Sequence, residues 1–315
     1  MGTAAARGTA LVTGGYGFLG RAMARRLKQD GWRVVGIGHG RWSPEEADAY
    51  NFDEWLDAEV NLPSLMTLRG PFELVAHCAG NGSVGYSVAH PLQDFHKTVV
   101  STADLLEFMR LSGSRATLVY PSSAGVYGAR ADEPIREADD LHPISPYGFH
   151  KKMVEELLAS YSTVFGIRIA VVRLFSVYGP GLTKQLLWDA GMRLRASRGG
   201  PATFWGTGDE TRDWIECDDA ARLLVAAADN PGSYSVFNGA NGNRVTVRET
   251  LEMLRAALDV DVAIEFNGSV REGDPRFYHA DIARASSLGW RPSVSLAEGI
   301  ESYARWLNRH EDHLT

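Results

Sequence analysis

Apolar and polar positions alternate in two ways along the first 175 residues of the chain. Short apolar runs are typical of buried strands, and the longer stretches between them carry the three- to four-residue apolar repeat of a helix. The predicted strands are Thr9 to Val12, Arg33 to Ile37, Phe72 to Ala79, Ala116 to Tyr120 and Ile167 to Arg173, with helices over Phe18 to Lys28, Pro91 to Leu111 and Pro146 to Phe165. This alternation predicts an α/β fold with a doubly wound parallel sheet that helices cover on both faces.

Beyond residue 175 the pattern is less regular and predicts a smaller lobe of mixed α/β structure. The expected elements are helices over Gln185 to Ser197 and Cys217 to Asp229, a strand over Tyr234 to Asn238, a helix that begins at Thr246 and a last helix that ends near Trp306. Thr246 and Ser295 each have a glutamate three residues on, the capping-box pattern of a helix start. We expect a dinucleotide-binding domain over 1–175 joined by 217–238, a substrate-binding lobe over 176–216 and 239–290, and a C-terminal helix over 291–315.

Charge and cysteine content narrow the class of protein. The chain has 315 residues with 32 basic and 39 acidic side chains, a net charge of −7, whereas a nucleic-acid binder needs a basic face. Cys78 and Cys217 are far apart and the histidines lack ligand spacing, so we expect two small core cysteines and no metal. The first residues do not resemble a signal peptide, and no apolar stretch reaches the ~18 residues of a membrane span. We therefore expect a cytoplasmic protein without membrane contact.

A glycine-rich turn, Thr13-Gly14-Gly15-Tyr16-Gly17-Phe18-Leu19-Gly20, follows the first strand. Gly14 permits a tight turn, Gly17 lets the backbone approach a pyrophosphate, and Gly20 lets the helix pack closely on the strand. The helix N-terminus then offers unpaired N–H groups to phosphate. A Rossmann-type dinucleotide site is therefore predicted, with the cofactor bound by Gly14, Tyr16, Gly17, Phe18, Leu19 and Gly20.

The end of the second strand bears on the choice of cofactor. It continues into Gly38-His39-Gly40-Arg41, without the carboxylate that binds the ribose 2′-hydroxyl of NAD. His39 and Arg41 could receive a 2′-phosphate, which favours NADP slightly over NAD; the alternative is that Arg41 is a solvated loop charge. Asn61, after a third strand whose bounds the pattern does not delimit, is a candidate partner for adenine.

A tyrosine and a lysine four residues apart, Tyr147 and Lys151, share one face of a predicted helix. An adjacent ammonium favours the phenolate, so we expect the pKa of Tyr147 to fall towards neutrality and make it an acid or base. Ser123 follows a predicted strand, at the sheet edge where open parallel sheets bind ligands. It could hydrogen-bond a substrate oxygen beside Tyr147; the alternative is that it merely ends the strand.

Together these motifs resemble an extended short-chain dehydrogenase/reductase of the nucleotide-sugar epimerase/dehydratase family. The resemblance covers nearly the whole chain. It rests on Thr13 to Gly20, His77 to Gly80, Ser123 to Gly128, Tyr147 to Lys151, Arg173 to Pro180, Gly208 to Trp214, Arg271 to Asp274 and Leu288 to Pro292.

The resemblance implies roles for individual residues. Ser123, Tyr147 and Lys151 match the catalytic residues of the family, and Lys151 would also bind the nicotinamide ribose. Arg212 and Arg271 match arginines that grip a nucleotide diphosphate; the alternative is that each pairs with a neighbouring carboxylate at the surface. The other implied contacts are Leu62, Cys78, Ala79, Gly80 and Pro121 for the cofactor, and Ser83, Ser176, Gln185, Leu186 and Tyr278 for the substrate. The helices over 91–111 and 146–165 would form a homodimer.

Three departures from the family pattern bear on the reaction. Ala124 and Gly125 stand where related sugar 4,6-dehydratases carry an acidic pair, so water elimination is not expected. Ser176 and Thr98 each replace an asparagine. These two changes put contacts to the sugar in doubt, but not the fold.

The leading hypothesis is a nucleotide-sugar 4-epimerase. Tyr147 would take the proton of the sugar 4-hydroxyl, assisted by Ser123, while a hydride leaves C4 for the bound nicotinamide; the 4-keto sugar then turns over and is reduced on its other face. The alternative is an NADPH-dependent reductase of nucleotide-4-keto-6-deoxysugars that uses the same residues once. A cofactor-sensing relative without catalysis is a third class, against which the complete Ser-Tyr-Lys set argues.

Overall fold

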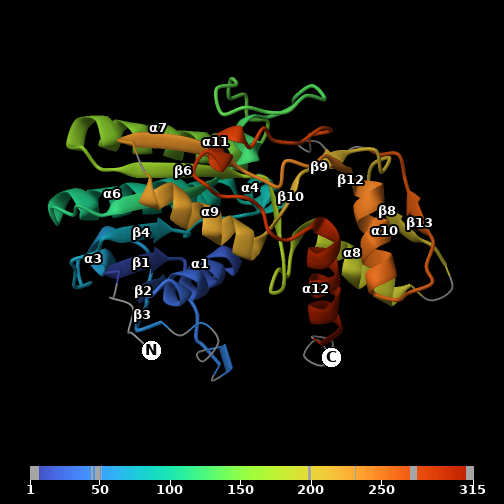
Figure 1. Cartoon of the computed structure of the whole chain (residues 1–315), viewed down its shortest axis with the longest axis horizontal. Helices are drawn as coiled ribbons and strands as arrows, with labels where there is room; N and C mark the ends of the chain where they lie inside the picture. The colour runs from blue at the N-terminus through green and yellow to red at the C-terminus, as the bar shows by residue number, and fades with distance from the viewer. Residues whose placement is uncertain are drawn as a thin grey trace.

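Among the described residues, seven parallel strands form the central sheet, in the order β11-β6-β5-β4-β1-β2-β3 (Figure 1). The computed structural model describes residues 7–43, 45–46, 50, 52–197, 200–230, 232–269 and 275–309. The strands are β1 (Thr9–Thr13), β2 (Arg33–Gly38), β3 (Glu54–Asp57), β4 (Leu74–His77), β5 (Thr117–Ser123), β6 (Ile169–Leu174) and β11 (Tyr234–Gly239). The predicted doubly wound parallel sheet is confirmed, and the chain returns to it through β11, which pairs with β6.

Helices cover both faces of this sheet because its strands are apolar on both sides. Leu11 of β1 belongs to one buried core and its neighbours Ala10 and Val12 to the other. On one face lie α1 (Phe18–Gln29) and α9 (Cys217–Asp229). On the other lie α3 (Leu62–Leu65), α6 (Ser101–Leu111) and α7 (Pro146–Phe165).

Two stretches of this part of the chain differ from the pattern predicted from sequence. The predicted helix over 91–111 is α5 (Pro91–Phe95), a π-helical turn η1 (His96–Val100) and α6 in succession. The sequence pattern did not delimit β3, because this edge strand is only half-buried. Cys217 is buried in the core as expected, whereas Cys78 at the end of β4 is partly exposed.

In the part of the chain that the structure describes, the second lobe is built from three helices and three short strand pairs. The helices are α8 (Gln185–Ala196), α10 (Val247–Ala257) and α12 (Leu296–Arg309), and the strand pairs are β7 (Ser176–Tyr178) with β10 (Trp214–Glu216), β8 (Ala202–Phe204) with β13 (Ile264–Phe266), and β9 (Thr211–Arg212) with β12 (Val245–Thr246). The short elements α4 (Val84–Ala89), η2 (Ala124–Val126) and α11 (Ala283–Ser286) complete the fold. Thr246 caps α10 with the predicted capping box.

The last helix packs into this lobe rather than standing apart. Tyr303 and Leu307 of α12 share a buried core with Leu187 of α8 and Leu251 of α10. The Tyr303 hydroxyl also donates to the Leu182 carbonyl oxygen at 2.7 Å. The domain boundaries drawn from the sequence stay a prediction, and this packing argues for counting α12 with the second lobe.

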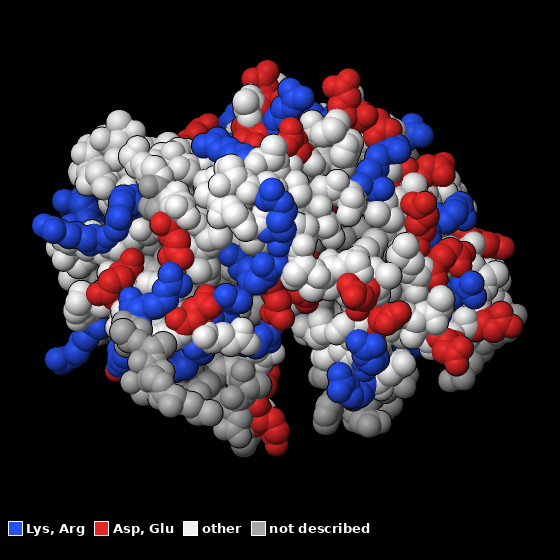
Figure 2. Space-filling model, viewed as in Figure 1, with Lys and Arg blue, Asp and Glu red and all other residues white. Residues whose placement is uncertain are grey.

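The surface carries charges of both signs. On the face shown in Figure 2, lysines and arginines are interspersed with acidic side chains rather than gathered in one stripe. Among the described helices, none is both long and apolar enough to cross a membrane.

Candidate active site

The glycine turn joins β1 to α1 where the parallel strands end. Gly14 has a φ of +64°, and a Cβ there would lie 2.6 Å from the Ala79 nitrogen. A Cβ at Gly20 would lie 2.2 Å from the Gly14 carbonyl oxygen, so a larger residue would push α1 off the strand. Gly17 caps α1 without a side-chain hydrogen bond, and the first turn of α1 holds no acid. The turn therefore leaves backbone N–H groups for a pyrophosphate.

A carboxylate that the sequence did not reveal lies beside the end of β2. Asp57 ends β3 directly opposite Gly38, and its carboxylate accepts from the Gly40 N–H at 3.4 Å. His39 and Arg41 are both exposed. Sequence reasoning missed Asp57 because it had not delimited β3.

Aromatic rings surround the loop after β2. Tyr16 of the glycine turn packs against Gly40, lies 4.9 Å from Trp42 between ring centroids, and has the Arg21 guanidinium 4.5 Å from its own centroid. Arg21 in turn forms an ion pair with Glu46 at 2.9 Å. This loop is therefore held by the glycine turn itself.

The other predicted cofactor residues lie at the ends of β3, β4 and β5. Asn61 caps α3 by accepting from the Ser64 N–H at 2.9 Å, and Leu62 is the first residue of that helix. Cys78, Ala79 and Gly80 follow β4, and the Ala79 N–H donates to Thr13 Oγ1 at 3.2 Å. The Asn61 carboxamide oxygen is thus engaged within its own helix; its contact with adenine stays a prediction.

Ser123, Tyr147 and Lys151 come together where β5 ends and α7 begins. Ser123 is the last residue of β5 and is hydrogen bonded to Tyr147. Lys151 Nζ donates to the Tyr120 hydroxyl and to the Pro121 carbonyl oxygen, each at 3.0 Å. The structure thus brings together the three residues that the sequence predicted to be catalytic.

The expected effect of Lys151 on Tyr147 is wrong for this arrangement. Burial raises the pKa of Tyr147, while the hydrogen bond to Ser123 lowers it and the charge of Asp94 raises it. The Lys151 ammonium points to β5 and lies 5.9 Å from the centre of the Tyr147 ring. Burial also lowers the pKa of Lys151 itself, to about 8. Desolvation therefore outweighs the attraction that the four-residue spacing suggested.

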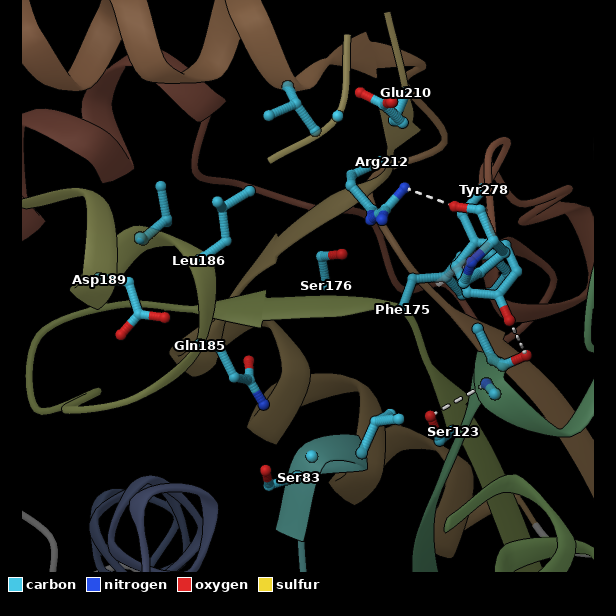
Figure 3. A pocket seen from close by; sticks show the side chains of 18 of the residues that line it. Ser83, Ser123, Phe175, Ser176, Gln185, Leu186, Asp189, Glu210, Arg212 and Tyr278 are labelled. Carbon is cyan, nitrogen blue, oxygen red and sulfur yellow. Dashed lines mark hydrogen bonds between the residues drawn. The ribbon is translucent and has the colours of Figure 1, made fainter. Parts of the chain in front are cut away.

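A cavity of about 620 Å³ opens from these residues towards the second lobe. Its walls hold the predicted substrate residues Ser83, Ser123, Tyr147, Ser176, Gln185, Leu186, Arg212 and Tyr278. Figure 3 shows Ser123 at one end of the cavity, Asp189 and Leu186 at another, and Arg212 on a strand above them. Arg271 lies outside the described residues.

The cavity also has charged residues that the sequence did not single out. They are Asp189, Arg193, Glu210 and Arg276. Arg276 lies five positions after Arg271 in the same segment, which was the available signal; the others follow from the packing of α8 and β9.

Arg212 does not form the surface ion pair that was its alternative interpretation. Its Nη1 donates to the carbonyl oxygens of Thr211 and Pro275, at 2.8 and 3.0 Å. The adjacent Asp213 is fully buried and accepts backbone N–H groups of Asn241 and Gly242 instead. The guanidinium of Arg212 therefore lines the cavity without a carboxylate partner among the described residues.

The second lobe reaches across the cavity to the first. Gln185, at the start of α8, donates from Nε2 to the Gly82 carbonyl oxygen at 2.8 Å, and Figure 3 shows it beside Ser83. Its φ is +68°, a left-handed conformation that is costly for a residue with a Cβ. No sequence signal indicated this strained bridge.

Comparison with known proteins defines the family. The NAD dependent epimerase/dehydratase family matches residues 10–239. The chain is 32% identical over 302 residues to the UDP-glucose 4-epimerase of Mycolicibacterium smegmatis, covering 92% of this chain and 95% of that one. The fold and site are those of an extended short-chain dehydrogenase/reductase. Within that class, this chain belongs to the NAD dependent epimerase/dehydratase family.

Two solved structures show the same fold over nearly the whole length. The UDP-glucose 4-epimerase of Thermotoga maritima with UDP-glucose has a TM-score of 0.86 at 27% identity, covering 96% of this chain and 99% of that one. A mutant UDP-glucuronic acid 4-epimerase of Bacillus cereus, in complex with UDP-4-deoxy-4-fluoro-glucuronic acid and NAD, has a TM-score of 0.85 at 26% identity with the same coverage.

The family and the glycine turn together define the cofactor class as a nicotinamide dinucleotide, NAD or NADP. The residues present fit this group, because Gly14 and Gly20 leave no room for side chains and the N-terminus of α1 is not capped by one. Near the end of β5, the Lys151 ammonium donates a hydrogen bond to the Pro121 carbonyl oxygen.

Proposed function

We propose that this protein is a UDP-sugar 4-epimerase that acts by transient oxidation at C4. The observation that carries the proposal is the meeting of Ser123 and Tyr147 at one end of a cavity that also holds Arg212. The relatives named above support it, because all three are 4-epimerases of UDP-sugars.

The residues of the chain divide the reaction between them. Tyr147 takes the proton of the sugar 4-hydroxyl in its deprotonated form, which burial disfavours by raising its pKa. Ser123 holds the same oxygen by a hydrogen bond. When bound, the nicotinamide ring supplies an acceptor for the hydride of C4. Tyr147 gives its proton back to O4 when the second C–H bond has formed, so neither protons nor electrons are consumed. Arg212 grips the diphosphate, while the sugar is free to turn.

Elimination of water is not part of this proposal. Ala124 and Gly125 offer no acid or base beside Ser123, and the Ala124 carbonyl oxygen accepts from the Tyr278 hydroxyl at 2.9 Å. The reductase alternative has no support among the relatives named above. We therefore keep the epimerase as the single proposed activity.

We propose NAD rather than NADP as the cofactor, which revises the slight preference drawn from the sequence. Asp57 would repel a 2′-phosphate from the end of β2, and Arg21 is already paired with Glu46. His39 and Arg41 remain the only support for NADP. Mass spectrometry of the small molecules released from the denatured protein tests this: retained NAD supports the proposal, and NADP contradicts it.

The activity is tested with a panel of nucleotide sugars. The protein is incubated with UDP-glucose, UDP-glucuronic acid and the dTDP-, GDP- and CDP-linked glucoses, and NMR follows the proton at C4. We expect the C4 epimer to form from a UDP-sugar. Epimerisation of none of these compounds by protein that retains cofactor would contradict the proposal.

We also propose a homodimer. Apolar side chains remain exposed on α4, α5 and α7, including Val88 (62% exposed), Leu92 (64%), Phe149 (49%) and Met153 (44%). A cluster of large apolar side chains at the surface marks an interaction site. Helices α4, α5 and α7 pack against one another, and we propose that these exposed residues take part in the contact with a second copy of the chain.

A further inference from the structure

A buried carboxylate lies behind the catalytic helix, and the reaction as described makes no use of it. Asp94 of α5 is fully buried. Its Oδ2 accepts from His150 Nδ1 at 2.5 Å, and its Oδ1 accepts from Asn81 Nδ2 at 2.7 Å. His150 is almost as buried and packs edge-on against Phe95. A buried charge is costly unless it is paired and hydrogen bonded, so this arrangement is a built feature.

The carboxylate joins the two sides of the active site. Asn81 belongs to the loop after β4, and it holds Ser83 by two hydrogen bonds: its Nδ2 donates to the Ser83 carbonyl oxygen at 2.8 Å, and its Oδ1 accepts from the Ser83 N–H at 3.1 Å. Ser83 lines the substrate cavity. His150 lies on α7 between Tyr147 and Lys151. Asp94 therefore links a substrate-lining loop to the helix that carries Tyr147 and Lys151.

We propose that Asp94 and His150 are positioning residues for the epimerisation, which hold the Ser83 loop against α7 and set the electrostatic surroundings of Tyr147. The inference rests on the proposed function for its kinetic consequences, but not for its effect on the ionisation of Tyr147. It assigns a task to a buried Asp–His hydrogen bond that the reaction itself does not use.

The charge of Asp94 acts on both catalytic groups. Burial is the largest influence on both: it raises the pKa of Tyr147 and lowers that of Lys151, and the charge of Asp94 pushes both pKa values upward. The other titratable groups near Tyr147 and Lys151 are His150 and Glu155 on α7, Tyr120 on β5, and His77 and Cys78 at the end of β4. Removing the charge of Asp94 thus favours the phenolate of Tyr147 at lower pH.

Asp94→Asn tests the charge, because it removes the charge but keeps the shape of the side chain. The carboxamide oxygen can still accept from Asn81, and the carboxamide NH2 group takes the place of the oxygen beside His150. The readout is the ultraviolet absorbance of tyrosinate against pH, taken as the difference between each protein and its own Tyr147→Phe counterpart. We expect the Tyr147 titration and the acid limb of kcat to move to lower pH. An unmoved titration would overturn the inference. Asp104→Asn, on α6, is the matched control and should behave as wild type.

A second pair of variants tests the positioning. His150→Asn keeps an N–H donor for Asp94, whereas His150→Ala removes it. We expect His150→Ala to lose kcat by roughly 10²-fold, the scale of a small misplacement at a reacting centre, and His150→Asn to recover most of it. Equal kcat in His150→Ala and wild type would overturn the inference, as would an equal loss in both variants.

Failure of the proposed function gives a different result. If wild type epimerises no nucleotide sugar, the tyrosinate titrations of wild type and Asp94→Asn still decide whether Asp94 acts on Tyr147. If Asp94→Asn does not fold, the two His150 variants decide the question through kcat.

Discussion

Tyr147 is the residue on which the proposed chemistry depends most. Its backbone N–H donates to Ser87 Oγ at 3.0 Å, which fixes the first turn of α7 to α4 independently of the phenol. Tyr147→Phe therefore removes the proton carrier and keeps the ring. We expect turnover to fall by roughly 10²–10⁴-fold, the usual scale for general acid–base catalysis, with little change in cofactor retention. Near-normal turnover in this variant would refute the assignment.

Arg212 carries the proposed grip on the diphosphate. Its guanidinium lines the cavity with backbone carbonyls, not carboxylates, as the partners described above. Arg212→Ala is expected to weaken UDP-sugar binding by about 1.5–3 kcal/mol, the scale of hydrogen bonds to charged groups. Calorimetric titration with UDP and with NAD is the measurement, and NAD affinity should change little.

The control for this prediction is an arginine of the same lobe outside the cavity. Arg248 lies over the Phe266 ring and is not among the residues that line the cavity. Arg248→Ala should bind UDP as wild type does. Equal UDP affinity in Arg212→Ala and Arg248→Ala would remove Arg212 from the diphosphate site.

Lys151 makes stability depend on pH. Burial lowers its pKa from 10.5 to about 8, so the unfolded chain binds this proton more tightly than the folded chain. As the pH falls from 10.5 to about 8, wild type loses stability relative to Lys151→Met. The loss reaches up to about 3 kcal/mol, at 1.36 kcal/mol per pKa unit. The loss is complete below pH about 8. The measurement is denaturant unfolding of cofactor-free wild type and Lys151→Met near pH 8 and near pH 10.5. A difference in unfolding free energy between the two proteins that does not change with pH would contradict the prediction.

Local spacing made part of the site predictable, residue by residue. Tyr147 and Lys151 follow each other at one helical turn, and Gly14 to Gly20 encode a turn within eight residues. Asp57 and Asp189 reach the site only through strand pairing and lobe packing, which no local pattern encodes. The predicted fall in the pKa of Tyr147 was wrong for the same reason, because the extent to which Tyr147 is buried depends on the whole fold.

At the scale of elements, the segment from α5 to α6 shows what periodicity can and cannot predict. The sequence predicted one helix over 91–111, and the π-helical turn His96–Val100 lies within it. A π-turn adds one residue to a single helical turn, and the apolar repeats of the α-helical turns on either side still predict one helix. Such turns often occur at functional sites, and here Thr98 accepts from the Asn81 N–H at 3.4 Å.

The exposed apolar face of α4, α5 and α7 leads to a prediction about assembly. Leu92→Glu places a charge on this face while disturbing nothing buried, since Leu92 is 64% exposed. We expect wild type to be a dimer in light scattering and Leu92→Glu to be a monomer with an unchanged circular dichroism spectrum. Met253→Glu, on α10 of the other lobe, should remain a dimer. A monomeric wild type would contradict the proposed interface.

For the whole molecule, the arrangement of the lobes decides what the site can do. The dinucleotide turn and the Ser-Tyr-Lys set belong to the first lobe, while Arg212 and the start of α8 come from the second (Figures 1 and 3). The sequence predicted the parallel sheet well because its strands are short, apolar and separated by helices. The second lobe was harder to predict, because its two- and three-residue strands pair across long stretches of chain.

The central claim is that one bound cofactor takes hydrogen from C4 of a UDP-sugar and returns it to the same carbon. The most direct test uses UDP-glucose or UDP-glucuronic acid carrying deuterium at C4, without added cofactor, and with mass spectrometry and NMR of the product. The account predicts the C4 epimer with deuterium retained at C4. Loss of deuterium from the product, or a net reduced sugar in place of an epimer, would contradict it.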